Sequence, residues 1–309
     1  MKLKLIASAV LAITVTAHAA STELVVGDQK GNARAVMSAA GELNNLPYEL
    51  KWYEFPNAAP LLESLNSQHL DAGLVGDGPL AFAVAAGANI RAIQASQYLG
   101  NGLLVKQNST IQTIADLKGK KVATVKGSSG QNMVLNALHQ AGLSDDSVSF
   151  VFTTPAEATL ALDNGAVDAV ATWEPYVSFA VAQSGDRIAI DGKDAPVSNY
   201  LVATDSAISE KRAALLDFRQ RLIRARAWGV AHPQEYAKGI ASLLRLPDAV
   251  ALSKVQRENN APVEDYALVA QRQQAAIDTF ARSGLIKPGL QASTLVDASF
   301  FGQQGAAKP

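Results

Sequence analysis

The fold of this chain is constrained most by a regular alternation of short apolar strands and helical segments, which occurs twice. In the first pass, residues 23–26, 50–55 and 72–75 read as strands, and a helical segment follows each of them. The second pass begins near Lys121 and repeats this order, ending with a strand over 169–172 and a helix beyond it. Such a rhythm is typical of a parallel sheet covered by helices. The sequence therefore predicts an α/β fold.

Corresponding residues of the two passes stand at a nearly constant distance in the sequence. Four pairs are separated by 97 positions: Phe55 and Phe152, Leu65 and Leu162, Asp71 and Asp168, and Asp77 and Glu174. We interpret the chain as two similar α/β lobes, with a chance likeness of two α/β segments as the alternative. On either interpretation, each lobe presents loops at the carboxyl ends of its strands, where open α/β sheets bind ligands.

The composition excludes several classes of protein. The 309 residues include 27 Lys and Arg against 28 Asp and Glu, a formal net charge of -1, so no basic excess favours nucleic acid as a partner. The chain contains no cysteine, which excludes disulfides, cysteine-ligated metals, thiol catalysis and a lipid attached to cysteine. The length is that of about two domains with a well-buried core.

Residues 1–19 have the pattern of a cleaved signal peptide. Lys2 and Lys4 precede a short apolar run over 5–15, and Ala17-His18-Ala19 fits the small-x-small rule for cleavage. The run is shorter than the ~20 apolar residues that span a bilayer; a buried N-terminal helix is the alternative. With no cysteine to carry a lipid, we expect an unanchored protein in the periplasm of a Gram-negative cell.

The loops at the strand ends carry few groups suited to catalysis. The chain has four histidines, one in the predicted signal peptide and three in or at the ends of predicted helices: His18, His69, His139 and His232. Common nucleophile, metalloprotease and nucleotide-binding motifs are absent from the sequence. Asp77 and Glu174 could form a glycosidase-like pair, but they are explained more simply as helix caps. We therefore expect no enzyme, no cofactor and no metal site.

Several loops instead combine Gly, Ser, Thr and Asn directly before a predicted helix. They lie at residues 29–32, 57, 76–78, 127–129, 153–154 and 172–173. A helix N-terminus has unpaired N–H groups and a partial positive charge, both of which attract anions. Every strand-to-helix loop needs Gly and cap residues, so one such loop indicates little. Their recurrence in both halves favours an anion site at which several helix N-termini meet.

Six segments resemble one known family. They are Gly27-Asp28-Gln29-Lys30-Gly31, Trp52-Tyr53-Glu54-Phe55-Pro56, Gly76-Asp77-Gly78-Pro79, residues 115–123 (ADLKGKKVA), Lys126-Gly127-Ser128-Ser129 and Trp173-Glu174-Pro175-Tyr176. Their order and spacing, from about residue 23 to residue 300, are similar to those of the periplasmic aliphatic sulfonate-binding proteins. That family belongs to the nitrate/taurine/sulfonate branch of ABC-transporter substrate-binding proteins.

The resemblance implies a type II periplasmic binding protein. Two α/β lobes would be joined by two crossover segments and would close like a clamshell on a ligand in the cleft between them. Residues 20–103 and 204–309 would form lobe 1, and residues 104–203 would form lobe 2. The closed form would dock on an inner-membrane ABC permease, and we expect the protein to be a monomer.

The resemblance also implies a set of ligand-binding residues. They are Gln29, Asn57, Gly76, Asp77, Gly78, Ser128, Ser129, Trp173 and Arg257. The amides of Gly78, Ser128 and Ser129 would hold the sulfonate oxygens, the two serine hydroxyls would add donors, and Trp173 would cover the tail. For Arg257 the alternative is a salt bridge to Glu258 or Asp265. Asp77 and Glu174 would repel an anion unless they face away from it or accept hydrogen bonds.

The expected function is that of the solute-binding component of an ABC importer for aliphatic or other small organosulfonates. The same fold could instead bind taurine, a sulfate ester, nitrate or another small anion. An enzyme similar to the pyrimidine synthases of thiamine biosynthesis is a further alternative, but such enzymes would use His with iron or a pyridoxal cofactor. The predicted loops contain few His residues, which argues against such an enzyme.

Overall fold

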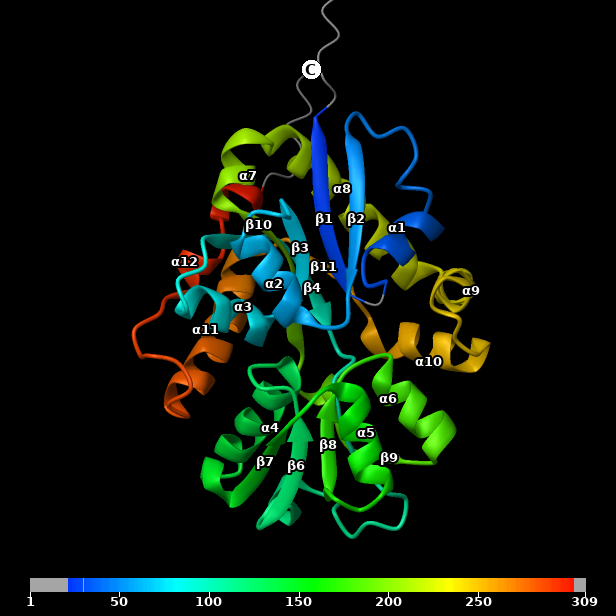
Figure 1. Ribbon diagram of the computed structural model, residues 1–309, viewed down its shortest axis with the longest axis vertical. Coiled ribbons are helices and arrows are strands. Elements are labelled where there is room, and N and C mark those ends of the chain that lie inside the picture. The colour runs from blue at the N-terminus through cyan, green and yellow to red at the C-terminus, as the bar shows by residue number, and fades with distance from the viewer. Residues whose placement is uncertain (1–21, 30, 303–309) are drawn as a thin grey trace, which may run out of the picture.

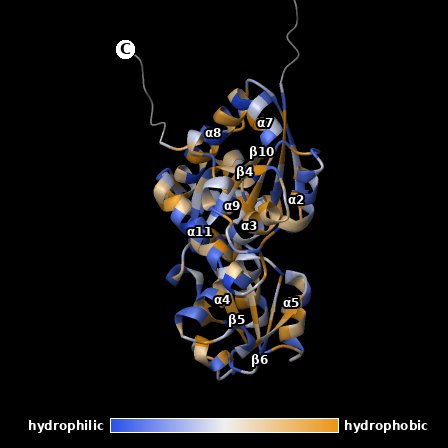
Figure 2. Ribbon diagram, turned by 90° about the vertical axis from the view of Figure 1, so that its left-hand side faces the viewer, coloured by the Kyte–Doolittle hydropathy of each residue, from blue (hydrophilic) through white to orange (hydrophobic). Residues whose placement is uncertain are grey.

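The computed structural model describes residues 22–29 and 31–302 as two mixed α/β sheets, each in its own lobe (Figure 1). The predicted signal peptide at 1–19 lies outside the described residues. The strands are coloured mostly as apolar in both lobes (Figure 2), as expected for sheets whose faces are covered by helices. The predicted α/β fold with two lobes is thus confirmed.

The first sheet has six strands in the order β11-β4-β10-β3-β1-β2. The strands are β1 (Glu23–Gln29), β2 (Glu49–Phe55), β3 (Ala72–Gly76), β4 (Ile90–Tyr98), β10 (Val197–Thr204) and β11 (Pro262–Val263). Strand β1 pairs in parallel with β2 and β3, whereas β10 runs antiparallel between β3 and β4. The carboxyl ends of β1 and β3 therefore open on the same edge of the sheet.

The second sheet has five strands in the order β7-β6-β8-β5-β9. The strands are β5 (Gly102–Val105), β6 (Lys120–Thr124), β7 (Val148–Phe152), β8 (Ala169–Thr172) and β9 (Arg187–Asp191). Strand β6 pairs in parallel with β7 and β8, and β5 runs antiparallel to β8. The strand order β3-β1-β2 of the first sheet thus recurs as β8-β6-β7 in the second.

One pair of the predicted repeat plays the same structural part in both lobes. The carboxylate of Asp71 accepts a hydrogen bond of 2.8 Å from the amide of Val25, at the start of the neighbouring strand. The carboxylate of Asp168 accepts one of the same length from the amide of Lys121. The recurrence along the sequence therefore reflects a repeated fold, and not a chance likeness.

The chain crosses between the sheets twice, through residues 99–101 and through residues 192–196. The sequence-based boundaries gave residues 104–203 to the second lobe. The structure places all of β5 in the second sheet and all of β10 in the first, so both crossovers come earlier in the chain than expected. Both strands are almost fully buried, and their burial pattern fits a central position in either sheet.

Helices cover both sheets. The first lobe holds α1 (Arg34–Ala39), α2 (Ala58–Asn66), α3 (Asp77–Ala85), α7 (Asp205–Glu210), α8 (Arg212–Ala231), α9 (Pro233–Leu244), α10 (Asp248–Glu258), α11 (Tyr266–Arg282) and α12 (Ala292–Leu295). The second lobe holds α4 (Ser129–Gln140), α5 (Pro155–Asp163) and α6 (Tyr176–Phe179). In the part of the chain that the structure describes, no helix combines the length and the apolar character needed to cross a membrane.

Candidate functional site

A cavity of about 450 Å³ lies at the junction of the two lobes. Its wall includes residues at or just beyond the carboxyl ends of four strands: Gln29, Gly76, Val125 and Trp173 follow or end β1, β3, β6 and β8, respectively. The two parallel portions of the sheets therefore point their carboxyl ends at one space, the usual location of ligands in open α/β folds. The volume is within the range of ~300–1,000 Å³ typical of small-molecule sites.

The structure brings six of the nine expected ligand-binding residues to this cavity. They are Gln29, Asn57, Gly76, Ser128, Ser129 and Trp173. The other three, Asp77, Gly78 and Arg257, are not among the residues that line it. Each of these three has a different structural position, and the contacts described below give the reason.

The N-terminus of α2 supplies one set of donors. Asn57 has an extended backbone, and its side-chain oxygen accepts a hydrogen bond of 3.0 Å from the amide of Ala59, as an N-cap residue does. Ala58 and Ala59 also line the cavity. Within residues 22–29 and 31–302, the amide of Ala58 has no hydrogen-bond partner. It is therefore free to bind an anion.

The N-terminus of α4 supplies a second set from the other lobe. Ser128 is the N-cap, and its hydroxyl oxygen accepts a hydrogen bond of 3.1 Å from the amide of Gln131. The amide of Ser128 donates to the carbonyl of Val125 at 3.2 Å, so it is not the free donor that we expected. The amide of Ser129, the first helical residue, has no partner among the described residues. The free donor of this loop is therefore the Ser129 amide.

Asp77 connects the two lobes and faces away from the cavity. Its carboxylate accepts hydrogen bonds from the hydroxyl of Ser129 at 2.5 Å and from the side-chain amide of Asn132 at 2.7 Å. Burial raises the pKa of Asp77, and these donors oppose the increase. The Ser129 hydroxyl that we expected to bind ligand is thus engaged by a carboxylate.

Gly78 lies at a close approach of the two lobes. A Cβ atom on this residue would come within 2.6 Å of the carbonyl oxygen of Gly127, in the loop that precedes α4. Its amide also contributes to lowering the pKa of Asp77. Gly78 therefore allows α3 and the α4 loop to touch, and this contact accounts for its absence from the cavity wall.

Glu174 lies on the cavity wall, but its carboxylate is fully buried and paired. Arg257 donates to it through Nε at 2.8 Å, and the amide of Ser178 donates at 3.2 Å. Burial, and then the charge of Glu258, raise the pKa of Glu174. Arg257 also pairs with Asp191 at 3.0 Å. The guanidinium therefore binds two carboxylates of the second lobe. It forms neither of the salt bridges suggested from the sequence, those to Glu258 and Asp265.

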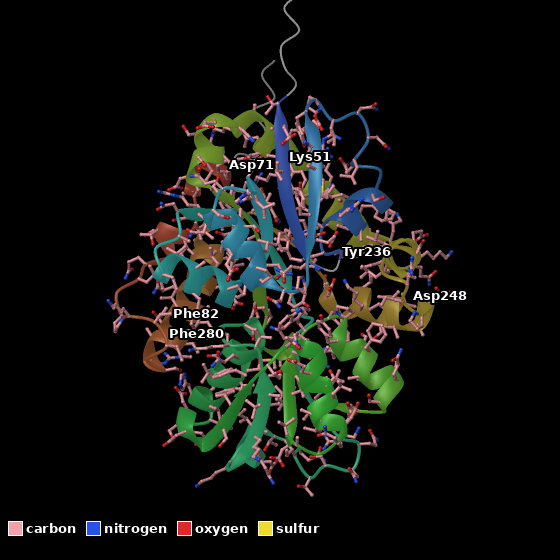
Figure 3. All side chains as sticks on the ribbon, in the orientation of Figure 1. Lys51, Asp71, Phe82, Tyr236, Asp248 and Phe280 are labelled. Atoms are coloured by element: carbon pink, nitrogen blue, oxygen red, sulfur yellow. The ribbon has the colours of Figure 1, made fainter. Side chains whose placement is uncertain are left out.

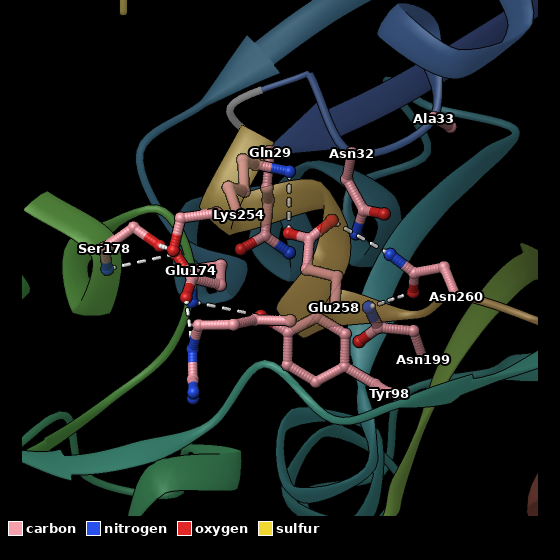
Figure 4. Close-up of polar contacts among 12 residues, drawn as sticks. Gln29, Asn32, Ala33, Tyr98, Glu174, Ser178, Asn199, Lys254, Glu258 and Asn260 are labelled. Atoms are coloured by element: carbon pink, nitrogen blue, oxygen red, sulfur yellow. Dashed lines mark hydrogen bonds and ion pairs between the residues drawn. The ribbon is translucent and has the colours of Figure 1, made fainter. Parts of the chain in front are cut away.

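A buried ion pair in the cavity wall was missed by the sequence analysis. Lys254 donates to the carboxylate of Glu258 at 2.7 Å, and both side chains are almost completely buried (Figure 4). Burial lowers the pKa of Lys254, but Glu258, Tyr236 and Glu174 together raise it above its usual value. Lys254 and Glu258 are four residues apart on one helix, which is also the usual spacing of solvent-exposed ion pairs. The sequence therefore does not distinguish this buried pair from an exposed one.

Asp28 organises the loop that carries Gln29 into the site. Its buried carboxylate accepts hydrogen bonds from the amides of Gln29 at 2.8 Å and of Ala33 and Arg34 at 2.9 Å each. Burial, and then the charge of Glu54, raise the pKa of Asp28 to about 6. The native protein therefore binds more protons than the unfolded chain between the unfolded pKa, near 4, and this value.

The free energy of unfolding should reflect this difference. Because the pKa of Asp28 is higher in the folded protein, its ionisation lowers the free energy of unfolding as the pH rises from about 4 to about 6. Above that range the loss is complete. We expect the stability of the wild type relative to Asp28→Asn to fall by about 3 kcal/mol between pH 4 and pH 7. Urea unfolding of both proteins at several pH values measures this difference in the free energy of unfolding. A difference that does not change with pH would contradict the raised pKa.

The described residues contain no group of three His, Asp or Glu side chains that could hold a metal ion. The polar groups at the cavity include helix-terminal amides, the capping side chains of Asn57 and Ser128, the Lys254–Glu258 pair, and the charged side chains of Lys126 and Glu63. Apolar side chains form another part of the wall and include Leu62, Phe82 and Trp173. The ring of Trp173 meets Tyr176 edge-on, with their centroids 6.1 Å apart. The arrangement suits an anion with an apolar tail.

Comparisons with known proteins agree with this geometry. The NMT1/THI5 like family matches residues 49–236, more than half of the chain. A protein of Escherichia coli strain K12 named as an aliphatic sulfonates-binding protein is 33% identical over 294 residues, which are 92% of each chain.

Two solved structures are also similar. The periplasmic aliphatic sulphonate binding protein SsuA from Escherichia coli has a TM-score of 0.79 and 32% identity, covering 89% of this chain and 97% of that one. The alkanesulfonate-binding protein SsuA from Xanthomonas axonopodis pv. citri, bound to MOPS, has a TM-score of 0.80 and 28% identity, covering 89% and 98%. The chain therefore belongs to the NMT1/THI5 like family, in the group of the aliphatic sulfonate-binding proteins.

Proposed function

We propose that this protein is the solute-binding component of an ABC importer and that it binds small organosulfonates in the cavity between its lobes. One observation carries the proposal: helix N-termini from different lobes, those of α2 and α4, meet at one cavity that also has an apolar wall. The ligand-binding residues would be Gln29, Asn57, Gly76, Ser128, Ser129 and Trp173.

The head group would be held mainly by hydrogen-bond donors at the helix N-termini, and Lys126, in the loop before α4, also lines the cavity. A sulfonate is fully ionised near neutral pH and accepts hydrogen bonds without donating any. The amides of Ala58 and Ser129 have no other partner in the described part of the chain, and each lies at the positive end of a helix dipole. Lys254 adds a buried ammonium group whose three donors are not all used by Glu258.

The carboxylates near the site do not prevent anion binding. Glu174 is paired with Arg257, and Asp77 accepts hydrogen bonds from Ser129 and Asn132. Their charges are thus directed at protein donors instead of the ligand. The same contacts connect the lobes, so they would also stabilise the closed arrangement.

The protein would release its ligand unchanged. The groups at the cavity are suited to holding an anion, and its curated relative is named as a binding protein. The signal-peptide pattern at 1–19 and the periplasmic relative together support export to the periplasm. There the closed protein, as a monomer, would deliver the sulfonate to an ABC permease of the inner membrane.

Thermal unfolding in the presence of candidate anions tests this function. At a concentration of about 100 times the Kd, a ligand that binds only the native state adds about 2.7 kcal/mol to its stability. We expect ethanesulfonate and butanesulfonate to raise the Tm by several degrees, and nitrate and sulfate to have much smaller effects. A Tm shift with nitrate or sulfate, and none with any sulfonate or with taurine, would contradict the proposal.

A further inference from the structure

The cavity continues beyond the head-group end as a groove between α2 and α3. Ala59, Leu62 and Asn66 line it from α2, at spacings of three and four residues that place them on one face of that helix. Pro79 and Phe82 of α3 line it in the same way, together with Ala86, the C-cap residue of that helix. The groove thus follows both helices from their N-termini, at the lobe junction, to their C-terminal ends.

The walls of the groove are apolar and fixed in position. Leu62 and Phe82 are both partly buried and packed against the core of the first lobe. Phe82 also meets Phe280 of α11 edge-on, with the ring centroids 4.8 Å apart, and both rings lie near the lobe junction (Figure 3). A ligand tail in the groove would therefore be buried against preformed apolar surface.

The far end of the groove is polar and open to water. Glu63 and Asn66 line it and are both exposed, as is Ala86 on the opposite helix. From Ala59 to Asn66 the helix rises about 10 Å at 1.5 Å per residue, which accommodates an extended tail of about eight carbon atoms. Further carbons would project into water beside the Glu63 carboxylate.

We propose that the groove between α2 and α3 is the tail subsite and that it selects sulfonates with an unbranched apolar tail of about six to eight carbons. This inference rests on the proposed function, because the sulfonate head group must occupy the helix N-termini for its tail to enter the groove. The cavity is continuous from those N-termini to Asn66, and the apolar side chains of Leu62 and Phe82 line it on this side, so they favour this direction for the tail.

A homologous series of alkanesulfonates measured by calorimetry provides the first test. Each added methylene should increase the affinity about three- to fourfold while it is buried in the groove. We expect this increase from ethanesulfonate to about octanesulfonate and little beyond it. Equal affinities along the series would overturn the tail subsite and leave sulfonate binding intact, whereas no binding at any length would contradict the proposed function itself.

A matched pair of variants provides the second test. Ala86 lines the groove and is exposed, and its neighbour Ala85 is exposed but does not line it. Ala86→Phe should reduce the affinity for octanesulfonate at least tenfold and leave that for ethanesulfonate unchanged. Ala85→Phe should change neither affinity. If Ala86→Phe weakens both ligands equally, or behaves like Ala85→Phe, the groove does not hold the tail.

Discussion

Lys254→Met is expected to lower the free energy of unfolding by about 3–5 kcal/mol, the loss typical of a broken buried ion pair. The substitution leaves the carboxylate of Glu258 buried without its cation, and among the described residues only the side-chain amide of Asn260, at 3.1 Å, remains as a donor. Methionine has nearly the length of lysine and adds no new polar group. The loss therefore measures the unpaired charge.

Two further variants test the assignment of this loss to an unpaired charge. In Lys254→Met/Glu258→Met, most of the stability should return, because replacing both members of a buried pair by apolar groups is often neutral. Lys193→Met removes a cation that is 66% exposed and lies 3.8 Å from Asp191, and it should cost about 0–1 kcal/mol. Urea unfolding followed by circular dichroism compares them. The account of the buried pair is contradicted if Lys254→Met loses no more stability than Lys193→Met.

The repeated architecture could be predicted because its residues act locally. Asp71 and Asp168 each accept a hydrogen bond from an amide near the start of a neighbouring strand, so the same residue type recurs at a similar point of each lobe. The helix N-termini could likewise be located from cap residues such as Asn57 and Ser128. Features of this kind can be predicted because the local backbone determines which residue types occur at these positions.

Ion pairs that depend on the tertiary structure could not be predicted in this way. The burial of Lys254 and its place in the cavity wall depend on packing around α10, and its spacing from Glu258 is that of a surface pair. Arg257 similarly reaches Glu174 and Asp191, which are distant in the sequence. The family resemblance suggested Arg257 as a ligand-binding residue but did not determine its partners, and Lys254 was not predicted at all.

The structure was also needed to identify which amide at the N-terminus of α4 is free. Both serines precede or begin the same helix, and the sequence assigned ligand donors to each. A turn in the loop directs the amide of Ser128 back to Val125, and the hydroxyl of Ser129 is engaged by Asp77. Only the backbone path shows that the Ser129 amide is the donor left for an anion.

The most direct test of anion binding by helix N-termini removes this one N–H group. Ser129 is the first helical residue, a position at which proline is well tolerated, and the backbone of Ser128, with φ -81° and ψ 165°, is compatible with a following proline. Ser129→Pro removes both the N–H and the hydroxyl, whereas Ser129→Ala removes only the hydroxyl. The difference between the two variants therefore isolates the N–H.

Calorimetric titration of both variants with butanesulfonate measures this contribution. A hydrogen bond to a charged group contributes about 1.5–3 kcal/mol, so Ser129→Pro should bind at least tenfold more weakly than Ser129→Ala, with both variants folded by circular dichroism. Equal affinities of two folded variants would contradict the claim that the N-terminus of α4 holds the sulfonate.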